Sequence, residues 1–243
     1  MPTGGDPDDQ LIDGIVKITA YVYPMPMIKG NFGEVAGKCE IIMTGIEVRW
    51  LARAFRRMTF DNRRFWNRRY TTDPEKGSGP GSRGENLDMK NALIKSTIHN
   101  YAMSTVLDIG CGDIAALCSL DIHNYVGVDI ADVIIERNRR LKPRWQFVCA
   151  DLTGPYAPPS AELVLCLDVL IHQKSRQNYL TILSKVLAAT ERVALISGYS
   201  QKDPGWNVFY HEAIGDSIRR LHPGSHIEKI AEYRTTDLLK VEK

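Results

Sequence analysis

Four mostly apolar segments in the middle of the chain share one pattern, in which a hydrophobic run ends in an aspartate. Their final acids are Asp108, Asp129, Asp151 and Asp168. Apolar runs of this kind predict strands that are buried on both faces of a sheet. Because the carboxyl ends of parallel strands meet at one edge, the pattern also predicts that the four acids gather there.

Helical patterns separate and follow these strands. Apolar positions recur every three to four residues in segments that predict amphipathic helices at 85–100, 133–141, 174–189 and 211–221. A further helix is expected at 114–120, directly after the first of the four acids. Additional strands are expected at 193–197, 227–233 and 236–241. The alternation of strands and helices predicts an α/β fold.

The first 45 residues differ in pattern from the rest. Short runs at 16–22 and 38–43 predict two strands. From about residue 46 to residue 70 the pattern becomes helical. We therefore expect an N-terminal extension over 1–45 and a second domain over 46–243.

The composition narrows the class of protein but not its partners. The chain has 243 residues, 44% hydrophobic and 25% charged, with a formal net charge of +2, as in an ordinary globular protein. Its five cysteines are odd in number and form no C-x-x-C pair, which favours free thiols in a reducing compartment. No apolar run approaches the roughly 18 residues of a transmembrane helix. The acidic residues 1–9 are unlike a signal peptide, so we expect a cytoplasmic protein without a membrane span.

A glycine turn follows the first acid-terminated strand. Gly110, Cys111 and Gly112 come directly after it, and such a turn lets the backbone approach a ligand closely. Asp129 lies 21 positions after Asp108, the usual spacing for an acid that binds ribose hydroxyls in a βαβ nucleotide site. Two interpretations remain open here. A dinucleotide would bring its pyrophosphate close to Asp108 at an electrostatic cost, whereas a ligand with a cationic amino-acid group would suit that carboxylate.

The pattern D-x-G-x-G at 108–112 closely resembles motif I of the class I S-adenosylmethionine-dependent methyltransferases. The resemblance covers about residues 61–243, with all four strand-end acids in the family's order. It implies a Rossmann-like, mostly parallel, seven-stranded sheet that ends in an antiparallel hairpin. One departure is that family members often carry a third glycine where Asp113 or Ile114 stands here.

The resemblance also implies a cofactor, S-adenosylmethionine, and a product, S-adenosylhomocysteine. Asp151 with the N–H of Leu152 would recognise the adenine amino group. Arg83, in a Gly/Ser-rich loop at 77–84, is our candidate partner for the cofactor's carboxylate, which a guanidinium can bind in bidentate fashion. The full set expected to bind the cofactor is Arg83, Gly84, Asp108, Gly110, Cys111, Gly112, Asp129, Ile130, Asp151, Leu152, Leu167 and Asp168.

Two histidines are candidates for a general base. His172 lies four residues after Asp168, so the two share a face if this loop is helical, and free histidine titrates near neutral pH. The alternative role of His172 is structural, at the start of the next helix. His211 is the rival base. Residues after the fifth strand that could contact the acceptor are Tyr199, Trp206, Tyr210, His211 and Glu212.

The identity of the methyl acceptor is less constrained. A Pro-Pro-Tyr or Pro-Pro-Phe signature after the fourth strand, typical of amino-methylating DNA enzymes, is absent, as is a Pro-Cys pair. The loop at 77–84 together with residues 165–172 resembles methyltransferase modules of surface-glycan biosynthesis, which are sometimes fused to glycosyltransferases. That resemblance implies O-methylation of a sugar hydroxyl or a small molecule, by one module of a longer chain.

Two other functions remain open. Eight arginines between 49 and 69, with interleaved aromatic residues, are consistent with an RNA methyltransferase, or with an ordinary solvated helical face. A non-catalytic scaffold that binds S-adenosylmethionine is the alternative of another class. We find no cluster of His, Cys and acidic residues with metal-ligand spacing, so no metal is expected.

Overall fold

The computed structural model describes residues 16–22, 37–43, 58–201 and 208–243. The chain divides into two compact units, Met1–Thr59 and Phe60–Lys243. In the first unit, β1 (Val16–Val22) pairs antiparallel with β2 (Gly37–Met43), which confirms the two strands expected there. The helical segment expected before residue 58, and Trp206, lie outside the described residues. The expected boundary near residue 45 remains a prediction.

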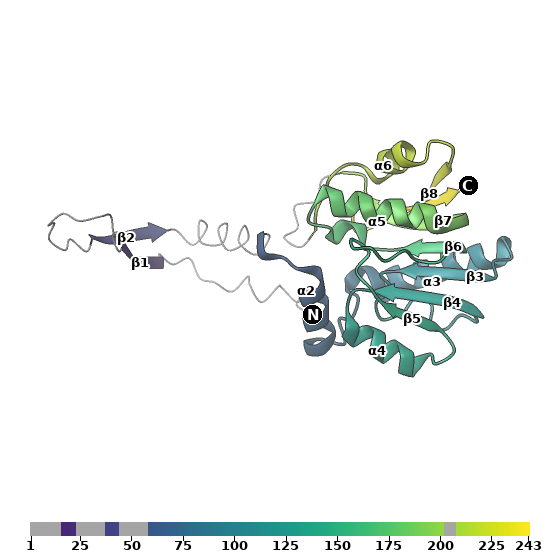
Figure 1. Cartoon of the computed structure of the whole chain (residues 1–243), viewed down its shortest axis with the longest axis horizontal. Coiled ribbons are helices and arrows are strands. Elements are labelled where there is room, and N and C mark those ends of the chain that lie inside the picture. Colours follow the sequence, from purple (N-terminus) through teal and green to yellow (C-terminus); the bar gives the residue numbers. More distant parts are fainter. Residues whose placement is uncertain (1–15, 23–36, 44–57, 202–207) are drawn as a thin grey trace. The chain divides into compact units, whose positions relative to one another are not determined.

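The second unit is built on one seven-stranded sheet (Figure 1). Its strands, in spatial order, are β5 (Gln146–Cys149), β4 (Asn124–Asp129), β3 (Thr105–Ile109), β6 (Ala161–Cys166), β7 (Thr190–Tyr199), β9 (Thr236–Glu242) and β8 (His226–Tyr233). β9 runs antiparallel to both of its neighbours, β7 and β8, and the other strand pairs of this sheet are parallel. The predicted Rossmann-like fold with a terminal antiparallel hairpin is confirmed. The chain leaves β3 toward one edge and later returns to β6 beside it, which opens a crevice at the carboxyl ends of these two strands.

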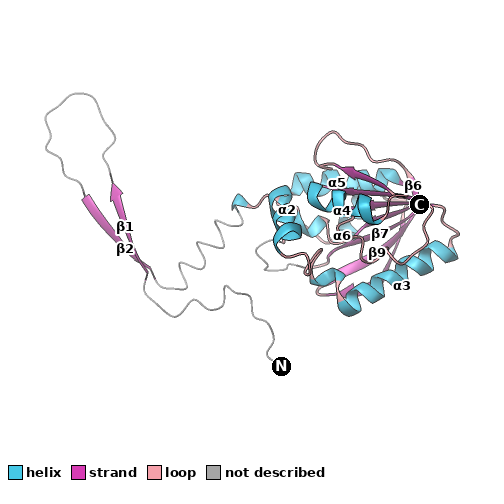
Figure 2. Ribbon diagram, turned by 90° about the horizontal axis from the view of Figure 1, so that it is seen from below, coloured by secondary structure: helices cyan, strands magenta, loops and turns pink. Residues whose placement is uncertain are grey.

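Helices cover both faces of the sheet, and each face has its own hydrophobic core. On one face, α3 (Gly84–Asn100) and α4 (Asp132–Leu141) pack on strand residues such as Val106 and Leu165. On the other, α5 (Arg176–Ala189) and α6 (Ile214–Leu221) pack on Leu107 and Val164. Figure 2 shows α3 and α5 on opposite sides of the strands. Successive strand residues therefore serve opposite cores, which explains the continuous apolar runs.

Several expected elements differ in the structure. Residues 115–119 form turns rather than a helix, after Ile114 adopts a left-handed backbone with φ of 51°. Strands β5 and β6 end before their acids. After β5, Asp151 accepts a hydrogen bond from the Thr153 N–H in a local turn. After β6, Asp168 has a positive φ, which does not fit a strand. The last helix begins at 214 and not at 211. Among the described residues, no helix is long and apolar enough to cross a membrane.

A truncation in the core between α5 and the sheet should destabilise the fold strongly. Leu183 is fully buried there, and Leu183→Ala is expected to reduce the free energy of unfolding by about 2–5 kcal/mol. Leu141 is 57% exposed at the end of α4, so Leu141→Ala is the matched control and should change the free energy by less than about 0.5 kcal/mol. Urea unfolding of both variants measures the difference, and equal losses would contradict this assignment of the core.

Candidate functional site

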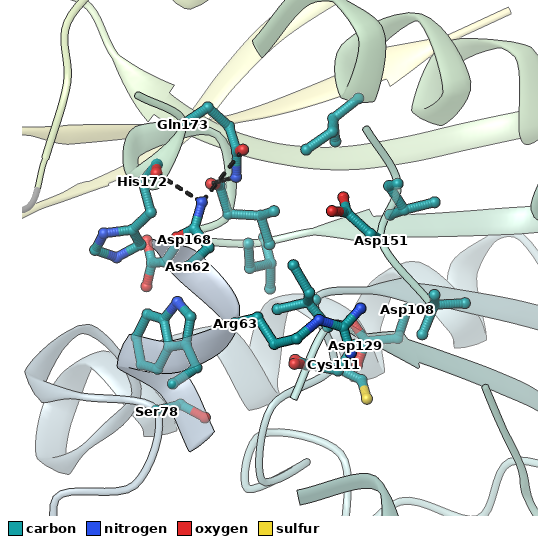
Figure 3. A pocket seen from close by; sticks show the side chains of 18 of the residues that line it. Asn62, Arg63, Ser78, Asp108, Cys111, Asp129, Asp151, Asp168, His172 and Gln173 are labelled. Carbon is teal, nitrogen blue, oxygen red and sulfur yellow. Dashed lines mark hydrogen bonds between the residues drawn. The ribbon is translucent and has the colours of Figure 1, made fainter. Parts of the chain in front are cut away.

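A cavity of about 360 Å³ opens at the carboxyl ends of β3, β4, β5 and β6 (Figure 3). Helix α2 (Asn62–Thr72) and the short 3-10 turn η3 (Leu170–His172) supply the rest of its wall. The structure brings ten of the predicted site residues to this wall: Asp108, Gly110, Cys111, Asp129, Ile130, Asp151, Leu152, Leu167, Asp168 and His172. The four strand-end acids therefore do meet at one site.

The glycine turn is shaped by close backbone contacts. Gly110 and Gly112 have φ of 71° and 51°, a left-handed conformation that glycine adopts without steric cost. A β-carbon at Gly110 would overlap the side chain of Val169, so the loop after β6 can pack directly on the turn. The N–H of Gly112 donates to Asp129 Oδ2 at 2.9 Å. The turn is thus held against the end of β4.

Asp129 and Asp108 are both buried, but their surroundings differ. Backbone N–H groups of Gly112 and Ala131 donate to the two oxygens of Asp129, each at 2.9 Å. Burial raises the pKa of Asp129, and these N–H groups oppose the rise. Asp108 accepts one hydrogen bond, from the Tyr125 hydroxyl at 2.9 Å, and burial raises its pKa to about 7. A cationic ligand group near Asp108 would favour its charged form.

Asp168 is half-buried and is the centre of an ion-pair network. Lys90, only 1% exposed, donates to Asp168 Oδ2 at 2.7 Å, and the Tyr233 hydroxyl donates to Oδ1 at 2.7 Å. Ser197 also bonds to Oδ1, at 3.2 Å. Burial alone would raise the pKa of Asp168, but Lys90 and Tyr233, with a contribution from His172, hold it below its ordinary value. Lys90 lines the cavity, and sequence reasoning missed it.

Helix α2 forms one wall of the cavity through Asn62, Arg63, Trp66 and Tyr70. Its start is capped by Asp61, which accepts from the Arg64 N–H at 2.7 Å. These spacings of three to four residues place the side chains on one face of the helix. Trp66 and Tyr70 therefore give this wall an aromatic surface.

A chain of amide hydrogen bonds joins α2 to the loop after β6. Gln173 Nε2 donates to the Val169 carbonyl at 3.0 Å, and Asn62 Nδ2 donates to the His172 carbonyl at 3.0 Å and to Gln173 Oε1 at 3.5 Å. Because a carbonyl only accepts, this order fixes the orientation of both amides. Asn62 Oδ1 is left buried without a partner among the described residues. A hydrogen-bond donor from a ligand would satisfy it.

The two candidate bases lie in different places. His172 lines the cavity, with its ring edge-on to Trp66 at 5.2 Å between centroids. His211 does not line the cavity: its Nε2 is 2.8 Å from the Gln173 carbonyl, which makes Nε2 the donor, and its ring packs on Tyr179. The geometry therefore favours His172 as the group that can reach a ligand.

Several other predicted site residues lie away from the cavity wall. Arg83 forms an ion pair with Asp113 and donates to the backbone carbonyls of Glu75 and Ser82. Its pairing with Asp113 was missed because the partner is 30 residues away. The remaining predicted residues outside the wall, among those described, are Gly84, Gly112, Tyr199, Tyr210 and Glu212. Among the residues that the structure describes, no three His, Cys or acidic side chains converge to hold a metal ion.

The sequence and the fold were compared with those of known proteins. A family model described as a methyltransferase domain matches residues 107–194. The fold is similar to the N-methyltransferase NodS from Bradyrhizobium japonicum WM9, solved with S-adenosyl-L-homocysteine, at a TM-score of 0.60 and 14% identity over 75% of this chain and 99% of that one. It is also similar to magnesium protoporphyrin IX methyltransferase from Synechocystis PCC 6803, at a TM-score of 0.55 and 15% identity over 75% of this chain and 100% of that one. A third similar structure is the methyltransferase domain of bacterial CtHen1, at a TM-score of 0.53 and 16% identity over 65% of this chain and 100% of that one. No curated protein sequence matches the chain.

The raised pKa of Asp108 predicts a pH-dependent stability. Between about pH 4 and 7 the folded chain holds a proton that the unfolded chain has released, so this group makes stability fall as pH rises. Asp108→Asn keeps an acceptor for the Tyr125 hydroxyl and removes the titration. Urea unfolding from pH 5 to 8 should therefore show a flatter profile for this variant than for the wild type. Asp121→Asn, at an exposed carboxylate, is the control and should follow the wild type; parallel profiles for all three would refute the assignment.

Proposed function

We propose that this chain is a class I S-adenosylmethionine-dependent methyltransferase that methylates a hydroxyl of a sugar or another small molecule with His172 as general base. The match of residues 107–194 to a methyltransferase-domain model and the similarity in fold support the first part of this proposal. The observation that carries the proposal is the position of His172 on the cavity wall beside Asp168, while His211 is hydrogen-bonded outside it. A base within reach of the acceptor is what O-methylation needs and what a scaffold would not need.

The residues of the cavity fit the cofactor. S-Adenosylmethionine supplies a methyl group already activated by its sulfonium charge. The acids that surround the crevice favour a cationic ligand, and the glycine turn allows a close approach of the backbone. Asp129 would hold the ribose hydroxyls, because each of its oxygens keeps a lone pair after accepting one N–H. Asp151 and Leu152, both on the wall, would hold the adenine.

The acceptor side of the cavity suits a neutral hydroxyl compound. Phe60 and Trp66 offer aromatic surface there, and Asn62 and Gln173 offer amide groups. The open Asn62 Oδ1 requires a hydrogen-bond donor, which a hydroxyl group provides. His172 would accept the proton of the reacting hydroxyl, and the charge of Asp168 would stabilise the imidazolium that forms.

Calorimetric titration with S-adenosylmethionine and S-adenosylhomocysteine tests the cofactor site directly. We expect micromolar binding of both to the wild type and its loss in Asp129→Ala, because the ribose contact and the support of the glycine turn disappear together. Unchanged affinity in the variant would remove the ribose assignment. No binding to the folded wild type would sink the proposal, and binding without methyl transfer to any acceptor would favour the scaffold.

Matched glutamine substitutions separate the two histidines. His172→Gln should lower turnover by roughly 10²–10⁴-fold, the usual contribution of a general base, with little change in affinity for S-adenosylhomocysteine. His211→Gln keeps a donor for the Gln173 carbonyl and should retain most activity. Initial rates of methyl transfer from radiolabelled cofactor measure both. If His211→Gln shows the larger loss, the base has been misassigned.

RNA is the second candidate acceptor, because Arg64 and Arg68 project from the exposed side of α2 and form no ion pair with any described residue. Phosphate contacts of this kind make binding strongly salt-dependent. If RNA is the acceptor, the double variant Arg64→Gln, Arg68→Gln should reduce the slope of log affinity against log salt by about 1–2 in a filter-binding titration. Activity on a small hydroxyl compound that the double variant retains in full would exclude this role for the two arginines.

A further inference from the structure

Arg63 lies at the second position of α2 and lines the cavity, and it is also exposed to solvent, as are Arg64 and Arg68 on the same helix. In Figure 3 its side chain extends from the helix across the cavity, with the guanidinium directed toward Asp129 and Cys111. This places a positive, planar group over the half of the cavity formed by the ends of β4 and β5.

The contacts of the guanidinium locate it more closely. Arg63 Nη1 lies 3.8 Å from Cys149 Sγ, at the last residue of β5, and Cys149 Sγ lies 3.7 Å from the Ile130 carbonyl, just after β4. Asp151 is expected at the adenine, and Ile130 is one of the residues expected to bind the cofactor. The guanidinium is therefore beside the predicted adenine position and not beside Asp168 at the other end.

The acids around Arg63 do not pair with it. Both oxygens of Asp129 accept backbone N–H groups, and Asp151 Oδ1 accepts from the N–H and the hydroxyl of Thr153. Within the described residues, the sulfur of Cys149 is the only polar contact of the Arg63 guanidinium. An arginine without a carboxylate partner remains available to a ligand, and its delocalised plane stacks well on an aromatic ring.

The helix that carries Arg63 is fixed on both sides of the cavity. Asn67 Nδ2 donates to Asp132 at the start of α4, and Trp66 and Tyr70 pack on Ala131 and Ile134. On the opposite side, Asn62 holds the loop after β6. The Cα of Arg63 is thus held in place, and only its side chain has to adjust to a ligand.

We infer that Arg63 closes the adenosine half of the cavity by laying its guanidinium plane against the adenine ring of the cofactor. This inference rests on the proposed S-adenosylmethionine site. A guanidinium at the other half would lie near the sulfonium and the Lys90 ammonium, where like charges repel one another. The neutral adenine ring is the part of the cofactor that a cation can cover without this cost.

The test uses two ligands that share the adenosine group: S-adenosylhomocysteine, and 5′-methylthioadenosine, which lacks the amino-acid part. Arg63→Ala should weaken both by about tenfold, a change typical of a lost cation–ring contact. Arg63→Lys keeps the charge without the plane and should recover only part of that loss. Arg64→Ala, at the exposed neighbouring residue, is the matched control and should bind both ligands as the wild type does.

The outcomes separate the inference from the proposed function. Wild-type affinity for both ligands in Arg63→Ala would overturn the inference while leaving the cofactor site intact. A loss for S-adenosylhomocysteine alone would also overturn it, because Arg63 would then contact the amino-acid part. Failure of the wild type to bind either ligand would refute the proposed function, and the inference with it. Thermal unfolding of each variant checks that the protein is folded under the conditions of the binding measurements.

Discussion

The ion pair between Lys90 and Asp168 ties together elements that are far apart along the chain. Lys90 comes from α3, Asp168 from the end of β6, and the two further donors, Ser197 and Tyr233, from β7 and β8. Removal of the Asp168 carboxylate would leave the Lys90 ammonium buried and uncompensated, at a cost of about 3–5 kcal/mol. This ion pair therefore holds one part of the cavity wall in place. It also positions the start of the loop that carries His172.

The two halves of the cavity are built in different ways. In the half at the ends of β4 and β5, the backbone of the glycine turn and further backbone N–H groups hold the side chain of Asp129. The half beside η3 is formed by side chains, with the amides of Asn62 and Gln173 in a fixed order. A main-chain site can remain constant while side chains change.

The sequence predicted the sheet and its gathered acids because those signals are local: an apolar run, an acid at its end, a glycine turn. It did not predict pairings set by the packing of distant segments. Arg83 is in the expected loop, but its guanidinium forms an ion pair with Asp113. Lys90 did leave a signal, since it stands between Leu87 and Ile94 on the apolar face of α3. Asn62 left none, because its partners are about 110 residues away.

Ile114 has a left-handed backbone and is almost fully buried, and it stands at one of the two positions where the family resemblance would allow a third glycine. A β-branched residue in this conformation is strained by about 1–3 kcal/mol, which the surrounding packing must offset. Glycine would relax the turn but would also let it sample other shapes. The buried isoleucine holds a single shape before any ligand arrives. The entropy of ordering this loop is therefore lost during folding, so that little of it opposes binding.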